Sequence, residues 1–315
     1  MLPTVQAPSS VSCRLFAALW RQQARTTPCP DTPRLDGALA LVTGGNAGIG
    51  LETSLGLARR GAEVILCARR EAEGEAAVAQ LETQTGRQAF FVRLDLGDLP
   101  AVTTAVREVA RRLPGRPVTH LVANAGLWPR EYRTSPQGHE LAFATNVLGH
   151  HLLLRGLSDV GALATRARVV IVTGDIYVTV RDASEDFTFT GATGGQTAYC
   201  RSKLANAWQA FELARREPTL EVVLVHPGVV ASGLGGSAGA AVDWAKRQML
   251  IDTVTGAQTS LWAATQPVTS GAYLHNTLGL VSLPEGDPAL QRGKAAACFD
   301  RIEALVAPYR PRSER

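Results

Sequence analysis

The sequence lacks several features that mark other classes of protein. None of its apolar runs is long enough to span a bilayer. The net charge is only +4 and the basic residues are dispersed, so we expect no nucleic-acid partner. The six histidines show no ligand spacing, and we expect no metal site. The few cysteines include no Cys-x-x-Cys pair, which indicates reduced thiols and a cytoplasmic location; they are Cys13, Cys29, Cys67, Cys200 and Cys298.

Residues 1–36 form an N-terminal extension that is rich in Pro, Ser and Thr. It contains one short amphipathic segment flanked by basic residues, from Arg14 to Arg21, whose apolar part is too short for a typical signal peptide. We expect an amphipathic helix packed on the protein body or a flexible tail. Weak contact with a membrane surface, and hence a peripheral location, is the alternative.

From residue 37 to residue 308, short apolar strands alternate with helices. This order predicts an α/β fold: a single-domain, Rossmann-type, doubly wound parallel sheet with both faces covered. Residues 309–315 are expected to be a tail. Ser135 and Pro136 are typical of a helix start, and predict a helix that reaches Leu157. We expect strands at 38–42, 62–67, 89–94, 118–123, 168–173, 221–225 and 272–274.

A glycine-rich turn, residues 43–50, follows the first strand and opens the first helix. Glycines let the backbone turn tightly and approach a pyrophosphate, which the helix N-terminus binds through free N–H groups. The spacing differs from the common dinucleotide fingerprint, but the strand before it and the helix after it support a cofactor site. The expected contacts are Gly44, Asn46, Gly48, Ile49 and Gly50.

The end of the second strand indicates which cofactor binds. NAD sites usually place an acidic residue there for the ribose 2′-hydroxyl. This sequence has Cys67-Ala68-Arg69-Arg70, with no acid and two guanidinium groups. Arginine suits a 2′-phosphate, so we expect NADP(H), although two solvated arginines at a strand end would look the same.

Tyr199 and Lys203 are four residues apart, which is one helical turn. Side chains at this spacing lie about 5–6 Å apart at their Cβ atoms. A neighbouring ammonium favours the phenolate form and lowers the pKa of a tyrosine, so the pair is suited to moving a proton to or from an alcohol or ketone. By itself the spacing also arises by chance on helix surfaces.

Together these motifs resemble the short-chain dehydrogenase/reductase family over about residues 36–280. The likeness adds Asp95-Leu96 after the third strand, Asn124-Ala125-Gly126 after the fourth and Pro227-Gly228 after the sixth. The retinol-dehydrogenase-like branch is closer still, because of the runs Asn146-Val147-Leu148-Gly149-His150 and Ala198 to Asn206, with Gly256 to Ser260.

The resemblance implies roles for the matching residues. Asp95 would meet the adenine ring, and Asn124 and Gly126 would line the cofactor trough. Lys203 would bind the nicotinamide ribose and lower the pKa of Tyr199. Further implied roles are a water held by Asn146 in a proton relay and a contact of Ser232 with the nicotinamide amide. The remaining expected cofactor contacts are Leu96, Ala125, Pro227 and Gly228.

One family element is missing. The family normally ends the fifth strand with a serine that binds the reacting oxygen, and this stretch reads Thr173-Gly174-Asp175. Gly174 stands at the serine position, or Asp175 if the register shifts by one residue. Losing such a donor typically lowers the rate by ~10²–10³. Thr173 is the expected replacement, with Tyr177 as another possible donor.

The sequence therefore predicts an NADP-dependent oxidoreductase acting on an alcohol or ketone of a lipophilic molecule, such as a retinoid, a steroid or a polyketide. The alternatives are a dinucleotide-binding protein with impaired turnover and a non-redox reaction on the same fold. Trp128, Tyr177 and Trp244 are candidates for an apolar pocket, or else core residues. The glycine-rich segment 233–241 is a mobile lid or a plain surface loop. A monomer and a homodimer are both compatible with the sequence.

Overall fold

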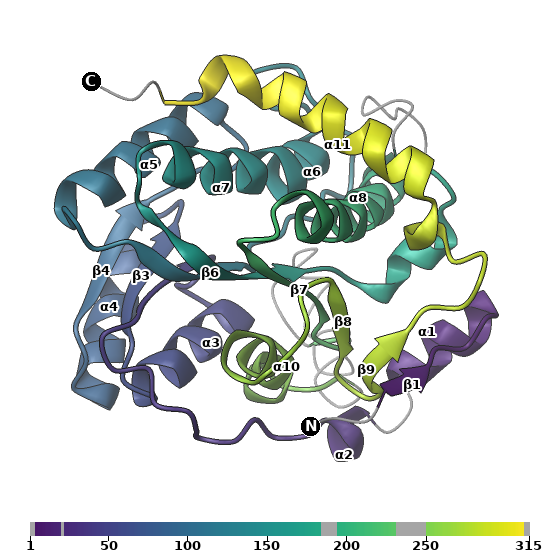
Figure 1. Cartoon of the computed structure of the whole chain (residues 1–315), viewed down its shortest axis with the longest axis horizontal. Helices are drawn as coiled ribbons and strands as arrows, with labels where there is room; N and C mark the ends of the chain where they lie inside the picture. Colours follow the sequence, from purple (N-terminus) through teal and green to yellow (C-terminus); the bar gives the residue numbers. More distant parts are fainter. Residues whose placement is uncertain (1–3, 20–21, 184–193, 231–249, 312–315) are drawn as a thin grey trace.

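The chain folds around one nine-stranded sheet in a computed structural model that describes residues 4–19, 22–183, 194–230 and 250–311 (Figure 1). The strand order is β1-β9-β8-β7-β6-β5-β2-β3-β4. Neighbouring strands run parallel, except that β8 and β9 are antiparallel. The expected doubly wound α/β fold is confirmed, with an antiparallel strand added near one edge.

The central strands are buried along almost their whole length because helices cover both faces of the sheet. Their sequences are accordingly continuous apolar runs rather than alternating patterns. The nine strands are β1 (Thr4–Gln6), β2 (Leu39–Thr43), β3 (Glu63–Ala68), β4 (Ala89–Arg93), β5 (Val118–Ala123), β6 (Leu163–Val172), β7 (Glu221–His226), β8 (Ala272–His275) and β9 (Gly279–Ser282).

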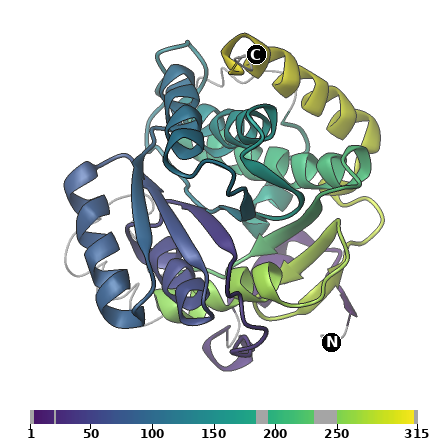
Figure 2. The same ribbon diagram turned by 60° about the vertical axis from the view of Figure 1, so that its left-hand side comes forward.

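Two layers of helices enclose the sheet, as the turned view also shows (Figure 2). One layer consists of α5 (Leu99–Arg112), α7 (Gly149–Asp159), α8 (Gly194–Arg216) and α11 (Arg292–Val306). The other layer consists of α3 (Gly48–Arg59), α4 (Glu71–Thr85) and α10 (Thr253–Thr265). No helix among the described residues is both long and apolar enough to cross a membrane.

The N-terminal extension is built into this fold. The expected helix is present as α1 (Val11–Leu19), and the short helix α2 (Gln22–Arg25) follows it. The sequence did not indicate β1, which pairs in parallel with β9. Figure 1 shows this purple segment beside the yellow-green end of the sheet. Two polar side chains of the extension, Arg14 and Gln22, are buried.

The prediction of a helix from Ser135 to Leu157 was wrong at its start. Ser135 instead closes a turn, in which its hydroxyl accepts a hydrogen bond from the backbone N–H of His139. The helix begins at Leu141, because Glu140 caps it with hydrogen bonds from Ala142 N and Phe143 N. The chain then passes through one π-helical turn, η1 (Ala144–Leu148), into α7. The antiparallel strand β9 and the helix α11 had not been predicted.

Candidate active site

The glycine-rich turn connects β2 to the N-terminus of α3. Gly44 and Gly48 have φ values of 65° and 58°, which L side chains rarely adopt. A Cβ atom at Gly50 would lie 2.2 Å from the backbone oxygen of Gly44, so only glycine fits there. The first N–H groups of α3 have no partner within the helix, and the chemistry of this end suits a phosphate group.

Arg69 and Arg70 are exposed at the carboxyl end of β3, beside this turn. Arg70 forms an ion pair with Glu73 on α4, at 2.5 Å. Glu73 also accepts a hydrogen bond from Asn46 of the turn. Arg69 has no ion pair with any described residue, so it is the arginine better placed to bind an added phosphate.

The carboxyl end of β5 is tied to the same turn through Thr43. The Thr43 hydroxyl accepts hydrogen bonds from the backbone N–H groups of Asn124 and Ala125 at 3.0 and 2.9 Å. The Asn124 amide donates to the Thr43 carbonyl at 2.9 Å. Gly126, next along the chain, is exposed. After β4, a carboxylate oxygen of Asp95 accepts the N–H of Gly97 at 3.0 Å, and Leu96 is buried.

Tyr199 and Lys203 lie side by side on α8, as expected, and both are buried. The Lys203 ammonium is 5.6 Å from the centroid of the Tyr199 ring and donates to the carbonyl of Val172 at 3.0 Å. Burial lowers the pKa of Lys203 to about 8. Burial also raises the pKa of Tyr199, so desolvation outweighs the expected effect of the ammonium. A protonated phenol at neutral pH is a proton donor.

Asn146 lies in the π-helical turn η1, a feature that often marks functional sites. Its side-chain amide forms hydrogen bonds in both directions with the backbone of Leu127, at 2.8 and 3.1 Å. It also donates to the Ser202 hydroxyl at 2.9 Å. Asn146 therefore joins the loop after β5 to the helix that carries Tyr199.

His150 forms a buried link that sequence reasoning missed. Its Nε2 lies 2.8 Å from the Thr43 hydroxyl and its Nδ1 3.1 Å from the Asn146 carbonyl. A carbonyl only accepts, so Nδ1 carries the proton and Nε2 accepts from Thr43. Burial lowers the pKa of His150 to about 4, which keeps the ring neutral. The run that ends in His150 was noted in the sequence, but nothing there indicated that Thr43 would be its partner.

The end of β6 does not present the expected replacement for the serine. The Thr173 hydroxyl donates its proton to the backbone carbonyl of Lys203 at 2.8 Å. In this position the proton is not available to a substrate oxygen, and we no longer expect Thr173 to replace the serine. Gly174 is extended, with φ of −156°, and a Cβ atom there would meet nothing closer than Ile176 at 3.9 Å. A Cβ atom would therefore fit at Gly174.

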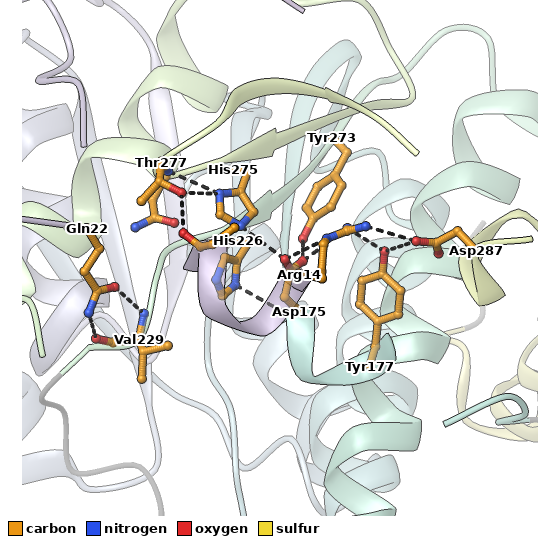
Figure 3. A network of polar contacts seen from close by, with 12 residues as sticks. Arg14, Gln22, Asp175, Tyr177, His226, Val229, Tyr273, His275, Thr277 and Asp287 are labelled. Carbon is orange, nitrogen blue, oxygen red and sulfur yellow. Dashed lines mark hydrogen bonds and ion pairs between the residues drawn. The ribbon is translucent and has the colours of Figure 1, made fainter. Parts of the chain in front are cut away.

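The Asp175 carboxylate is buried away from this position, in a network of polar groups (Figure 3). Both oxygens are occupied by donors from other elements: Arg14, Tyr273 and His275. Although Asp175, His226 and His275 lie close enough to ligate a metal, these donors use the lone pairs that a metal would need. The hydroxyl of Tyr177 is likewise committed, donating to Asp287 and accepting from Arg14.

Trp128, in the loop after β5, covers the catalytic candidate. Its indole ring is stacked on the ring of Tyr199, with centroids 4.7 Å apart and planes 3° from parallel.

Of the other predicted site residues, Gly228 follows β7 with φ of 94°, and a Cβ there would lie 2.5 Å from the Asn276 amide. Ser232, Trp244 and the segment 233–241 lie outside the described residues.

The chain belongs to the short-chain dehydrogenase family: the family model described as short chain dehydrogenase matches residues 38–243. Curated relatives include retinol dehydrogenase 14 of Mus musculus, 32% identical, with 88% of each chain covered. A polyprenol dehydrogenase of Danio rerio is also 32% identical, covering 78% of this chain and 81% of the relative. The resemblance to the retinol-dehydrogenase-like branch is confirmed, and the family is one of oxidoreductases that bind a nicotinamide dinucleotide.

Solved structures agree on the fold. An uncharacterized protein from Mycobacterium paratuberculosis superposes with a TM-score of 0.71 at 28% identity, covering 90% of this chain and all of that one. A short chain dehydrogenase from Escherichia coli CFT073, solved in complex with NADPH, gives a TM-score of 0.59 at 22% identity. The superposition covers 77% of this chain and 97% of the Escherichia coli chain.

Proposed function

We propose that the protein is an NADP(H)-dependent oxidoreductase that transfers a hydride between nicotinamide and an alcohol or ketone of a lipophilic small molecule. The observation that carries the proposal is the buried pair of Tyr199 and Lys203, which lies against the carboxyl end of β6 through the bond from Lys203 to Val172. The carboxyl ends of parallel strands, where the glycine-rich turn also lies, form the usual ligand site of such folds.

The residues present fit the proposed cofactor. The glycine-rich turn has no room for side chains at Gly50, and its helix N-terminus suits a pyrophosphate. Arg69 would bind a 2′-phosphate, with Arg70 held to Glu73 beside it. Tyr199 and Lys203 would also contact the cofactor, and the further proposed contacts are Gly44, Asn46, Gly48, Ile49, Asp95, Leu96, Asn124, Ala125, Gly126, Pro227, Gly228 and Ser232.

Tyr199 would donate its proton to the substrate oxygen during reduction. Its phenol is protonated at neutral pH, and burial raises its pKa further above the ordinary value; a positioned acid contributes roughly 10²–10⁴-fold to a rate. Lys203 holds the end of β6 through Val172 and would bind the ribose. When bound, NADPH supplies the hydride. The hydrogen bond from Asn146 to Ser202 joins the turn η1 to α8, the helix that carries Tyr199 and Lys203.

An apolar substrate is supported by two observations. Relatives are named as retinol and polyprenol dehydrogenases, which act on lipophilic alcohols. The indole of Trp128 places an apolar surface directly on the ring of Tyr199. Indole rings pack well against extended hydrocarbon chains.

The test is to follow nicotinamide absorbance while purified protein is offered NADPH and a panel of ketones and aldehydes of increasing apolar length. Turnover that rises with chain length and vanishes in Tyr199→Phe supports the proposal. Tight NADPH binding with no turnover of any carbonyl or alcohol would instead identify a dinucleotide-binding protein with impaired chemistry.

A further inference from the structure

Arg14, a buried side chain of the N-terminal extension, contacts the segment that follows β6. Arg14 of α1 is 1% exposed, although α1 precedes the region matched by the family model. Its guanidinium donates to Asp175 Oδ2 and Oδ1 at 2.8 and 3.3 Å. It also donates to Tyr177 Oη at 3.0 Å and to Asp287 Oδ2 at 3.1 Å (Figure 3).

Asp175 connects this guanidinium to the residues that hold Lys203. Its own backbone N–H donates to Nδ1 of His226, the last residue of β7, at 3.3 Å. Two residues earlier, the Thr173 hydroxyl donates to the carbonyl of Lys203. Lys203 returns a bond to the carbonyl of Val172. An uninterrupted series of contacts therefore runs from α1 through the end of β6 to α8.

A second buried side chain of the extension holds the segment that follows β7. Gln22 of α2 is 3% exposed, and its amide forms two hydrogen bonds with the backbone of Val229, one to the carbonyl and one from the N–H, each 3.0 Å long. Figure 3 shows this pair beside the Arg14 network. Val229 directly follows Pro227 and Gly228, which we propose as cofactor contacts.

The choice of residues indicates a role beyond attachment of the helix. Burying a guanidinium costs desolvation energy, and apolar side chains would fasten a helix at least as well. A planar guanidinium that donates to fixed partners, in contrast, specifies a single arrangement of those partners. Arg14 meets Asp175 next to Gly174, where the family residue is missing, and thus fixes the segment in which this chain departs from its family.

We propose that Arg14 and Gln22 are positioning residues of the active site, so that the N-terminal extension sets the geometry of the β6 and β7 ends. The inference rests on the proposed function. Arg14 acts on the proton-transfer side, through the end of β6 and Lys203. Gln22 acts on the cofactor side, through Val229.

The test compares Arg14→Met, Arg14→Lys and Gln22→Leu in the full chain. We expect Arg14→Met to lower kcat by at least about tenfold, because small misplacements of reacting groups cost up to ~10²-fold. Its Kd for NADPH, measured by fluorescence, should rise by a smaller factor than kcat falls, because Lys203 keeps its ammonium, and Arg14→Lys should recover part of the rate. Gln22→Leu should weaken NADPH binding by about fivefold or more, because Val229 loses two hydrogen bonds.

Arg155→Met is the matched control. Arg155 pairs with Glu217 and Glu303, and so joins α7 and α11 to the residue that follows α8, at the end of that helix far from Tyr199. This variant should lower thermal stability without changing kcat or the NADPH Kd. The double variant Arg14→Met/Asp175→Asn removes both charges and should regain stability while its kcat stays low. A rate that recovers together with stability would overturn the inference, as would unchanged NADPH affinity in Gln22→Leu.

Measurements of NADPH binding distinguish a failure of the proposed function from a failure of the proposed role of the extension. If the wild-type protein binds NADPH but reduces no carbonyl, the proposed function fails, while Gln22→Leu still tests the role of the extension through Kd. Amide hydrogen exchange of residues 173–177 in the NADPH complex tests Arg14 without turnover. Faster exchange there in Arg14→Met than in Arg155→Met supports its role, and equal exchange contradicts it.

Discussion

The indole ring of Trp128 lies parallel to the phenol ring of Tyr199, with centroids 4.7 Å apart. The two side chains come from the loop after β5 and from α8, and Asn146 joins these two elements nearby through Leu127 and Ser202. Trp128 therefore removes one face of the catalytic candidate from water. This cover helps to explain why burial raises the pKa of Tyr199.

Trp128→Ala should lower the pKa of Tyr199 toward its ordinary value near ~10, because the phenolate would then be hydrated. Ultraviolet difference titration of phenolate detects the change. The titration of Trp128→Ala/Tyr199→Phe serves as the blank, because subtracting it removes the absorbance of the other tyrosines. Trp128→Phe keeps an aromatic cover and should shift the pKa much less. Equal pKa values in the wild type and Trp128→Ala would show that the indole contributes nothing to this desolvation.

Arg69→Asp should weaken binding of NADPH by about tenfold or more while leaving NADH affinity nearly unchanged, since a charge-assisted bond to phosphate is worth about 1.5–3 kcal/mol. Titration with both cofactors gives the two constants. Arg70→Asp is a useful comparison, because Arg70 is already paired with Glu73. Tighter binding of NADH than of NADPH by the wild-type protein would refute the assignment of NADP(H).

Tyr199→Phe should abolish turnover with little effect on cofactor affinity, because only the proton-donating hydroxyl is lost. Lys203→Ala should reduce both turnover and cofactor affinity. In the wild type, the rate should fall as pH rises through about 8, where Lys203 loses its charge. A near-normal rate in Tyr199→Phe would mean that another group transfers the proton.

The parts of this architecture that follow from local sequence were predictable. Buried strands such as β2 and β7 read as apolar runs, and the turn at Gly44 needs conformations that glycine supplies. The pair Tyr199 and Lys203 follows from the helical period. Each of these signals lies within a few neighbouring residues, so a single sequence carries it.

The missed features depend on residues that are far apart in the sequence. Arg14 meets Asp175 across 161 positions and Gln22 meets Val229 across 207. Isolated in the sequence, Arg14 resembled the basic flank of a surface helix. The pKa of Tyr199 shows a related limit of local sequence: the ammonium of Lys203 is visible in the sequence, whereas the burial that raises this pKa is not.

The free energy of unfolding should depend on Asp175 at acidic pH. Burial by itself would raise the pKa of this carboxyl, but His226, His275 and Arg14 outweigh that effect and hold it below the usual range. Its stabilising contribution is therefore present above the unfolded pKa near ~3.9 and is lost as pH falls toward the lower folded value. The groups that face it are Arg14, Tyr177, His226, Tyr273 and His275.

Asp175→Asn should thus be less stable than the wild type by about 3 kcal/mol at neutral pH, as for a broken buried pair, and the difference should narrow below about pH 4. Denaturant unfolding at several pH values measures it. Burial lowers the pKa of His226 to about 3, although Asp175 partly offsets this effect, so His226 adds nearly the same loss of stability to both proteins only above about pH 3. A gap that stays constant with pH would contradict the ion-pair account.

The last prediction concerns the serine that the family places at the end of β6. Gly174 is extended and has open space at its Cβ, so Gly174→Ser should fold normally. If the natural site lacks a donor for the reacting oxygen, the added hydroxyl should raise kcat by about tenfold or more, since one such donor is worth ~10²–10³ in other enzymes.

Gly174→Ala is the matched control, because it adds the Cβ without the hydroxyl. Thr173→Val removes the bond to the Lys203 carbonyl and should lower the rate only through the position of Lys203. Adding Gly174→Ser to Thr173→Val should then still raise the rate. If Thr173→Val costs more than about tenfold and Gly174→Ser brings no gain, the Thr173 hydroxyl turns to the substrate during catalysis and supplies the donor itself.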